Sequence, residues 1–227
     1  MNTLTSKKRN LQPLTIVIGL LCIALAVWYL FQTVLFIESK NIELKRDLIG
    51  VFSLIRKAFG YLSIVLNLLL LIWFIIMRNR LSKGILVTSV IGLLMILVIS
   101  FLNRVVNHFS LIEGDGRTIY MYFTSAIGLV YNILIGAAFI LMNRQFNDKL
   151  GKWALVIGIL YVIGLVIGLS GSVISVVFPK HYPTSGYLSV LHKLNIGAGF
   201  IAVLRYIAMT IFFFVFVRIE RGKITDK

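Results

Sequence analysis

Long uninterrupted runs of apolar residues dominate the chain, and short polar segments separate them. Six of these runs are long enough to cross the roughly 30 Å hydrocarbon core of a bilayer, which takes about 20 helical residues. They cover residues 14–36, 58–77, 84–102, 119–142, 153–178 and 195–217. The strands of a membrane barrel would instead alternate apolar and polar positions over about ten residues. The pattern therefore predicts an all-α bundle of about six transmembrane helices that forms one domain over residues 1–227.

The composition agrees with a chain that lies in lipid. Hydrophobic residues make up 59% of the sequence and charged residues only 14%, with a mean hydropathy of +0.96. Soluble domains carry roughly 45–50% apolar and about 25% charged residues. The net charge of +15 comes from short basic clusters between the apolar runs, which is typical of headgroup contacts rather than of nucleic-acid binding. We therefore expect membrane lipids as partners, with a membrane protein or a second copy as the alternatives, and no nucleic acid.

The distribution of basic residues predicts the orientation. Lys7, Lys8 and Arg9 precede the first apolar run, as in a signal peptide, but this run is longer than a signal sequence requires and is interpreted as a retained helix. More basic residues fall on the side of the two termini than on the other side, and every segment on the terminal side is basic. The positive-inside rule then predicts a multi-pass protein of the plasma membrane with both termini in the cytoplasm.

The connection before the second span has a pattern of its own. Over residues 42–57, apolar side chains recur every three or four positions, from Leu44 to Ile55, with basic residues between them. This periodicity predicts an amphipathic helix that either lies on the membrane surface or extends the second span.

Similar segments open the first and third spans, at residues 15–21 and 88–94. A true duplication would produce three tandem helical hairpins, although apolar helices also resemble one another by chance.

Polar residues inside the spans are the candidates for function. Asn67, Asn132 and Arg205 lie 11, 12 and 13 residues before an arginine at the end of their spans, which places all three about 16–20 Å into the membrane. A polar layer at this depth is costly and generally faces the bundle interior. Arg205 needs a partner, a water-filled cavity or a route to the surface, because no acidic residue lies in these runs. Together with Arg104 and His192 on the outer face, these residues are hypothetical sites for an anionic ligand.

Small residues in the last two spans predict close helix packing, at Gly164, Gly168, Gly197 and Gly199. Residues 168–171 also match the GxSG motif of rhomboid-type intramembrane serine proteases, with Ser170 in the place of the nucleophile. The AHxxG pattern of that family is missing, because His192 stands five residues before Gly197. A protease of this type needs a histidine base beside its serine, so we interpret Ser170 as a packing residue.

No signature of a metal site, a cofactor or a nucleotide site is found, so we expect none of these ligands and no catalytic residue. The sequence favours a non-enzymatic membrane protein that acts by binding a lipid, an anionic ligand or a partner, such as an accessory or immunity-type subunit. A small permease with its polar layer at Asn67, Asn132 and Arg205 is the first alternative, and a rhomboid-like hydrolase is the second.

Overall fold

The computed structural model describes residues 2–38, 44–109, 112, 115–146, 148–177 and 185–225. Within these ranges the chain forms six long helices and one 3₁₀ turn, and no strand. The helices are α1 (Asn2–Glu38), α2 (Leu44–Ile76), α3 (Lys83–Phe109), α4 (Asp115–Gln145), α5 (Asp148–Val177) and α6 (Ser185–Thr225). All six are long and apolar enough to span a membrane. The predicted six-helix membrane bundle is confirmed.

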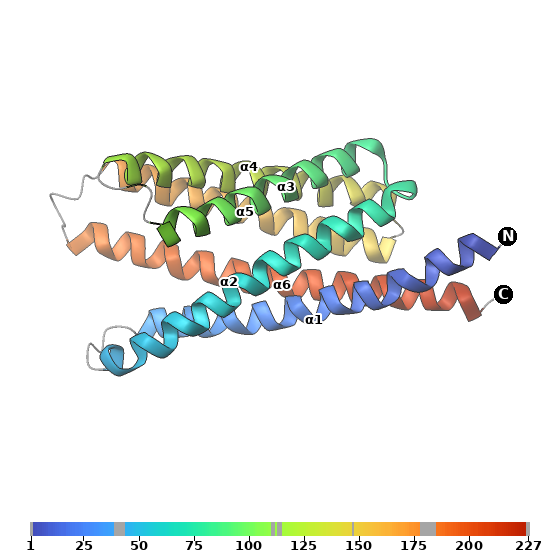
Figure 1. Ribbon diagram of the computed structural model, residues 1–227, viewed down its shortest axis with the longest axis horizontal. Coiled ribbons are helices and arrows are strands. Elements are labelled where there is room, and N and C mark those ends of the chain that lie inside the picture. The colour runs from blue at the N-terminus through green and yellow to red at the C-terminus, as the bar shows by residue number, and fades with distance from the viewer. Residues whose placement is uncertain are drawn as a thin grey trace.

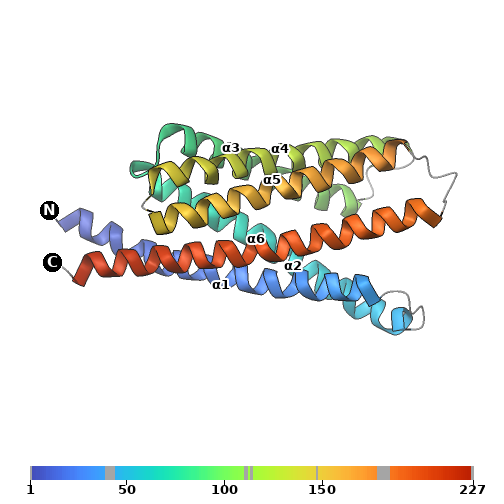
Figure 2. The ribbon, with the colours of Figure 1, turned by 180° about the vertical axis from the view of Figure 1, so that it is seen from behind.

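The six helices form a ring in which each helix packs against the next one along the chain, and α6 closes the ring against α1. In Figure 1, α3, α4 and α5 lie on one side, α1 and α6 lie on the other, and α2 runs obliquely between them. Figure 2 shows the same arrangement from behind, with α6 crossing in front of α1. Both termini lie at one end of the bundle, which we call the terminal end, and the opposite end is the distal end.

The helices extend beyond the apolar runs that predict them. α2 begins at Leu44 and continues without a break to Ile76, so from Leu44 onward the amphipathic segment is the start of the second helix. Residues 42 and 43 lie outside the described part of the chain. At the terminal end, a 3₁₀ turn over Met77–Asn79 leads from α2 to α3. Gln145 of α4 accepts a hydrogen bond from the Ser82 amide at 3.0 Å and donates to the Arg80 carbonyl, which fixes this turn to α4.

The core of the terminal half is a group of buried aromatic side chains that we call the aromatic cluster. The ring of Trp73 packs edge-on against Phe213 at 5.4 Å between centroids, and its Nε1 donates to the Thr15 hydroxyl at 3.2 Å. Each ring of the cluster is no more than 1% exposed. Its members are Trp73 and Phe74 of α2, Phe139 of α4, and Phe212 and Phe213 of α6. The cluster therefore joins α2, α4 and α6 across the middle of the ring.

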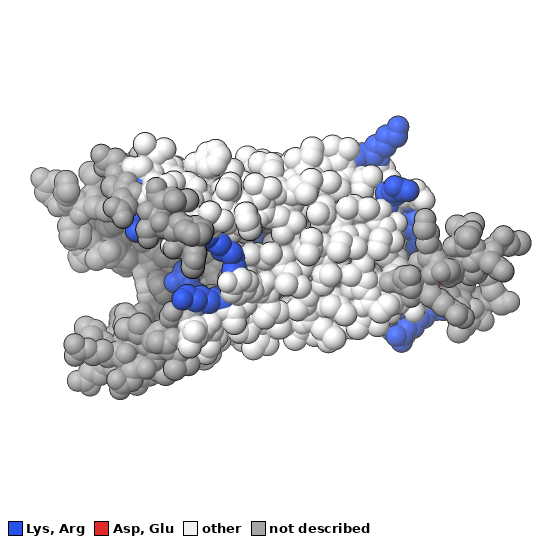
Figure 3. Space-filling view, in the orientation of Figure 1, with Lys and Arg blue, Asp and Glu red and all other residues white. Residues whose placement is uncertain are grey.

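The outside of the bundle is apolar around its middle. Large hydrophobic side chains such as Val27, Leu68 and Val166 are exposed there, and lipid would cover them at no cost. In Figure 3 the middle of this face carries no lysine or arginine, and the basic side chains lie toward the two ends. This is the distribution that a membrane-spanning bundle requires.

Candidate functional site

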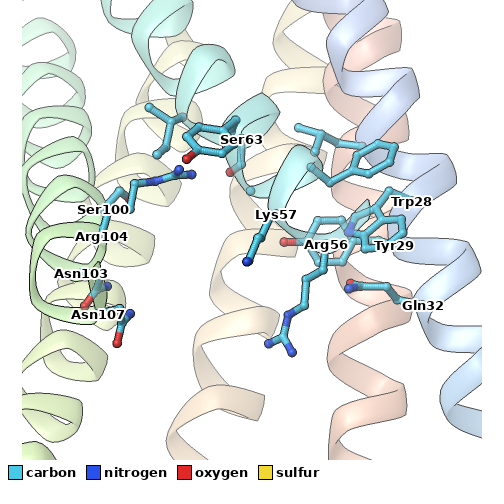
Figure 4. Close-up of a pocket in the computed structure, with 15 residues that line it drawn as sticks. Trp28, Tyr29, Gln32, Arg56, Lys57, Ser63, Ser100, Asn103, Arg104 and Asn107 are labelled. Atoms are coloured by element: carbon cyan, nitrogen blue, oxygen red, sulfur yellow. The ribbon is translucent and has the colours of Figure 1, made fainter. Parts of the chain in front are cut away.

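A cavity of about 960 Å³ opens at the distal half of the bundle between α1, α2 and α3. We call it the distal cavity. Its described lining comes from all three helices: Leu25, Trp28, Tyr29 and Gln32 of α1; Arg56, Lys57, Phe59, Gly60, Tyr61, Ser63 and Ile64 of α2; and Ser100, Asn103, Arg104 and Asn107 of α3. Figure 4 shows α3 on one side of this space, α1 on the other, and α2 with Arg56 and Lys57 between them.

Three cations converge on the distal cavity from two helices. Arg56 and Lys57 lie 22 and 21 residues before Arg78, and Arg104 lies 21 residues after Lys83. A rise of 1.5 Å per residue puts all three about 30–33 Å from the terminal end of their spans, at the opposite boundary of the membrane core. The chain therefore brings positive charge from α2 and α3 to the level of the distal headgroups.

Arg104 is held in place by an aromatic ring. Its guanidinium carbon lies 3.5 Å from the centroid of the Tyr61 ring. The guanidinium also passes close to Gly60, the residue before Tyr61 on α2. This cation–π contact bridges α3 and α2 across the cavity wall, and Figure 4 shows the Arg104 side chain reaching from α3 toward α2. The ring attracts the charge without neutralising it. Arg104 therefore presents an unneutralised positive charge at the cavity wall.

The remaining lining separates into a polar part and an apolar part. The polar part also includes the amides of Gln32 on α1 and of Asn103 and Asn107 on α3, and no acidic residue is found among the described lining residues. Apolar side chains, among them Trp28 and Phe59, complete the wall, and these two rings stack at 4.5 Å between centroids and 2° between planes. Guanidinium and ammonium groups bind phosphate and carboxylate oxygens well. The cavity can therefore hold an anionic head against its cations and an apolar body against its other wall.

A second polar group lies deeper in the ring of helices, and we call it the inner cluster. The Tyr131 hydroxyl donates to Asn67 Oδ1 at 3.2 Å and lies 3.4 Å from the Tyr161 hydroxyl. The guanidinium carbon of Arg205 lies 4.6 Å from the Tyr161 ring centroid and 5.2 Å from that of Tyr206. The inner cluster therefore consists of Asn67 of α2, Tyr131 of α4, Tyr161 of α5, and Arg205 and Tyr206 of α6.

The residues proposed from the sequence are distributed over these places. Asn67 and Arg205 meet in the inner cluster, through two tyrosines rather than directly. Arg104 lines the distal cavity. Asn132 is partly buried on α4 and makes no side-chain hydrogen bond within the described residues. His192 is partly buried on α6 and is not among the described lining of the distal cavity.

Ser170 lies within α5, and its hydroxyl donates to the Val166 carbonyl of the same helix at 2.9 Å. This is its one hydrogen bond among the described residues, so the hydroxyl is not joined to His192.

The glycines of the last two helices approach their neighbours to different degrees. A Cβ on Gly199 would collide with Thr33 of α1, so α1 and α6 cross closely at this point. A Cβ on Gly164, Gly168 or Gly197 would lie 3.6–3.9 Å from the nearest atom, which is ordinary contact. Two glycines of α5 approach the backbone of α4 more tightly: an added Cβ would lie 2.8 Å from the Asn143 carbonyl oxygen at Gly151 and 2.9 Å from the Gly136 carbonyl oxygen at Gly158.

Sequence reasoning missed the tyrosines of the inner cluster. Tyr131, Tyr161 and Tyr206 stand in otherwise apolar runs, and their presence at about the depth of Arg205 was the available signal. It placed Arg56 and Lys57 in the predicted amphipathic helix ahead of the second span, but it did not place them at a cavity with Arg104.

The described residues contain no group of three or more histidine, cysteine, aspartate or glutamate side chains that could hold a metal ion. Comparison of the chain with protein-family models, with curated proteins and with solved structures finds no match.

Proposed function

We propose that this protein is a non-enzymatic protein of the plasma membrane that binds an anionic lipid by its headgroup in the distal cavity. The observation that carries the proposal is that Arg56, Lys57 and Arg104 all line one cavity, with no acidic residue in the described lining. The three cations stand at the depth of a lipid phosphate. A phosphoryl anion accepts several hydrogen bonds from such groups, and arginine can donate two of them in parallel.

The depth of the distal cavity favours a lipid over a soluble anion. Ile64 lies seven residues beyond Lys57 along α2, so the lining descends about 10 Å below the cations into the hydrocarbon core. Leu25, Phe59 and the stacked ring of Trp28 line this region. An acyl chain or glycerol backbone would contact these side chains while the phosphate meets the cations. A soluble anion would leave the apolar wall without a partner.

We further propose that the terminal end faces the cytoplasm, so that the distal cavity opens to the outer leaflet. The basic turns at the terminal end support this orientation. This orientation is compatible with a role as an accessory or immunity-type subunit, because a lipid bound in the distal cavity can form part of the contact with a neighbouring membrane protein.

A small permease is the second candidate, and one contact favours it. Tyr29 lines the distal cavity and also stacks on Tyr206 of the inner cluster, at 5.5 Å between centroids. Polar groups therefore continue from the cavity toward the middle of the membrane. Against this candidate, the aromatic cluster fills the terminal half, and all six helices run unbroken through their spans. Flux of anions in proteoliposomes would distinguish a permease from a binding protein.

The lipid proposal is tested by removing the three cations together. Near an anionic surface each lysine or arginine contributes about 1 kcal/mol to lipid binding, so three contribute roughly 3 kcal/mol, or about a hundredfold in affinity. We expect purified wild-type protein to prefer a fluorescent short-chain phosphatidylglycerol over the matching phosphatidylcholine. The variant with Arg56→Gln, Lys57→Gln and Arg104→Gln should lose that preference by about this factor, as measured by titration in detergent.

The matched control removes the same charge from the terminal end, by Arg78→Gln, Lys83→Gln and Arg221→Gln, three exposed positions. This variant should keep the preference. Equal losses in the two triple variants would show that net charge alone attracts the lipid, and would refute a site in the distal cavity. Displacement of the probe by millimolar inorganic phosphate would identify the ligand as a soluble phosphate rather than a lipid.

A further inference from the structure

Arg205 places a full positive charge within the hydrocarbon core, on the distal side of its middle. It lies 13 residues before Arg218 on α6, about 20 Å from the terminal boundary of a core roughly 30 Å thick. A guanidinium keeps its charge in proteins. The single acidic residue within the six spans is Glu220, and it pairs with Arg80 at the terminal end, at 3.0 Å. No carboxylate of the spans is therefore near enough to neutralise Arg205.

The protein stabilises this charge only in part. The rings of Tyr161 and Tyr206 lie 4.6 and 5.2 Å from the guanidinium carbon, which is the range of cation–π attraction. An aromatic face attracts a cation but is a poor acceptor for its N–H groups. The Nε atom is completely buried and has no hydrogen-bond partner. Within the described residues the Arg205 side chain makes no hydrogen bond or ion pair at all.

Arg205 is partly buried, and its guanidinium lies against two buried rings of the bundle. Tyr161 and Tyr206 are 2% and 7% exposed, and the guanidinium lies against both of them. Tyr131 and Asn67 extend the same polar group to α4 and α2. These contacts hold the Arg205 side chain at the inner cluster and do not lead it toward the headgroups. A buried N–H donor without an acceptor, such as the Nε group of Arg205, carries a cost that a bound acceptor removes.

We infer that Arg205 is the centre of an inner site for one small monovalent anion, of the halide class. One uncompensated positive charge calls for one negative charge. A small ion is favoured because the Nε atom is completely buried and the rings of Tyr161 and Tyr206 lie close to the guanidinium. A halide accepts several N–H donors without a fixed geometry, and the ring faces of Tyr161 and Tyr206 hold the cation beside it. This site is separate from the proposed lipid site, and neither proposal depends on the other.

The anion reaches this site from the distal end. Seven residues along α6 toward the terminal end, Phe212 is fully buried in the aromatic cluster, which blocks that side. On the distal side, Tyr29 stacks on Tyr206 and forms part of the distal cavity wall. Tyr29 therefore lies between the distal cavity and the inner cluster, on the side from which we expect the ion to enter.

The test uses the melting temperature of the purified protein as a function of halide concentration. Cys22 is the single cysteine and is 0% exposed, so a thiol-reactive dye reports unfolding. Chloride is varied from 1 to 300 mM in a neutral detergent, with gluconate keeping the ionic strength constant. We expect the wild-type melting temperature to rise by about 5 °C or more. A roughly hundredfold excess of ligand over its dissociation constant stabilises the folded state enough to cause this shift in a chain of this length.

Variants assign the effect to the inner site. Arg205→Gln should abolish the chloride dependence, whereas Arg221→Gln, an exposed position on the same helix, should retain it. The triple variant of the distal cavity should also retain it, which separates this proposal from the lipid site. A flat response in the wild type, or a full response in Arg205→Gln, would overturn the inference. If Arg205→Gln fails to fold, anomalous diffraction from wild-type crystals grown in bromide decides: a peak beside the Arg205 guanidinium supports the site, and its absence there refutes it.

Discussion

Gly158→Ala adds one methyl group where α4 and α5 cross, and we expect it to weaken the bundle. The new Cβ would lie 2.5 Å from Ile140 Cγ1, 2.9 Å from the Gly136 carbonyl oxygen and 3.1 Å from the Ile140 amide nitrogen. The Ile140 side chain can rotate away, but the two backbone atoms cannot. The helices must therefore separate by about 0.5 Å to restore ordinary contact distances. Overpacking of this kind costs about 1–3 kcal/mol.

Helix propensity works in the opposite direction and sets the net value. Alanine is more favourable than glycine inside a helix by about 0.5–1 kcal/mol, so the net loss at Gly158 is about 0.5–2 kcal/mol. Gly128 on α4 is the matched control, because a Cβ there would have no atom within 4 Å. Gly128→Ala should therefore stabilise the protein by up to about 1 kcal/mol. The two variants should differ by about 1–3 kcal/mol.

The assay is thermal unfolding in detergent, followed by exposure of Cys22 to a thiol-reactive dye. At about 2–4 °C per kcal/mol for a chain of this length, Gly158→Ala should melt several degrees below Gly128→Ala, with the wild type between them. The α4–α5 contact would be shown not to be tightly packed if Gly158→Ala melted at or above the wild type. Equal shifts in the two variants would mean that propensity, and not packing, decides their stability.

Two further predictions concern the aromatic cluster and the orientation. Trp73→Ala should cost about 3–5 kcal/mol and lower the melting temperature by roughly 10 °C. Leu102→Ala on the outer face, where the side chain is 40% exposed, should change the melting temperature little. Similar shifts in the two variants would contradict a core at Trp73. For the orientation, a cysteine introduced by Ser82→Cys should resist a membrane-impermeant thiol reagent in intact cells, and one introduced by Arg117→Cys should react. Labelling of Ser82→Cys alone would invert the proposed orientation.

The architecture could be predicted because lipid imposes one strong constraint on the sequence. A backbone in hydrocarbon must satisfy its own hydrogen bonds, so each apolar run of sufficient length becomes a helix. The ends of the helices were less predictable. α2 extends to Leu44, well before the apolar run that begins at residue 58, because the amphipathic residues ahead of it can stay helical in the headgroup region. The run length therefore indicates how much helix lies in lipid, not where the helix begins.

The depth of the site residues could be counted from the sequence, but their lateral partners could not. The rise of a helix gives depth directly, and Asn67 and Arg205 do share one polar group. Which side of each helix faces the interior depends on packing against its neighbours. Asn132 has nearly the same predicted depth but does not join the hydrogen bonds of the inner cluster. The adjacent Tyr131 takes that position instead, because consecutive residues of a helix point about 100° apart.

The same uncertainty in helix rotation explains the glycines. A GxxxG spacing such as Gly164 to Gly168 marks a face that permits close approach, without saying which helix approaches it. In the structure α5 approaches α4 tightly at Gly158, nearly two turns earlier and opposite Gly136, and again at Gly151 near the start of α5. Gly199 and Thr33 form the corresponding close crossing of α6 and α1. The position of the neighbouring helix therefore determines at which small residue the two backbones approach closely.

The two candidate sites follow from how the halves of the bundle are filled. In the terminal half, the rings of Trp73, Phe139 and Phe212 join α2, α4 and α6 in the middle of the ring and leave no space for a ligand between them. α2 runs obliquely (Figure 1), and in the distal half a cavity separates it from α3. Polar and charged side chains inside a membrane protein are costly unless they have partners. Here they occur where the aromatic packing ends, at Arg205, and where the cavity opens, at Arg104. The cost of placing cations at these two positions is the physical reason for the two anion sites that we propose.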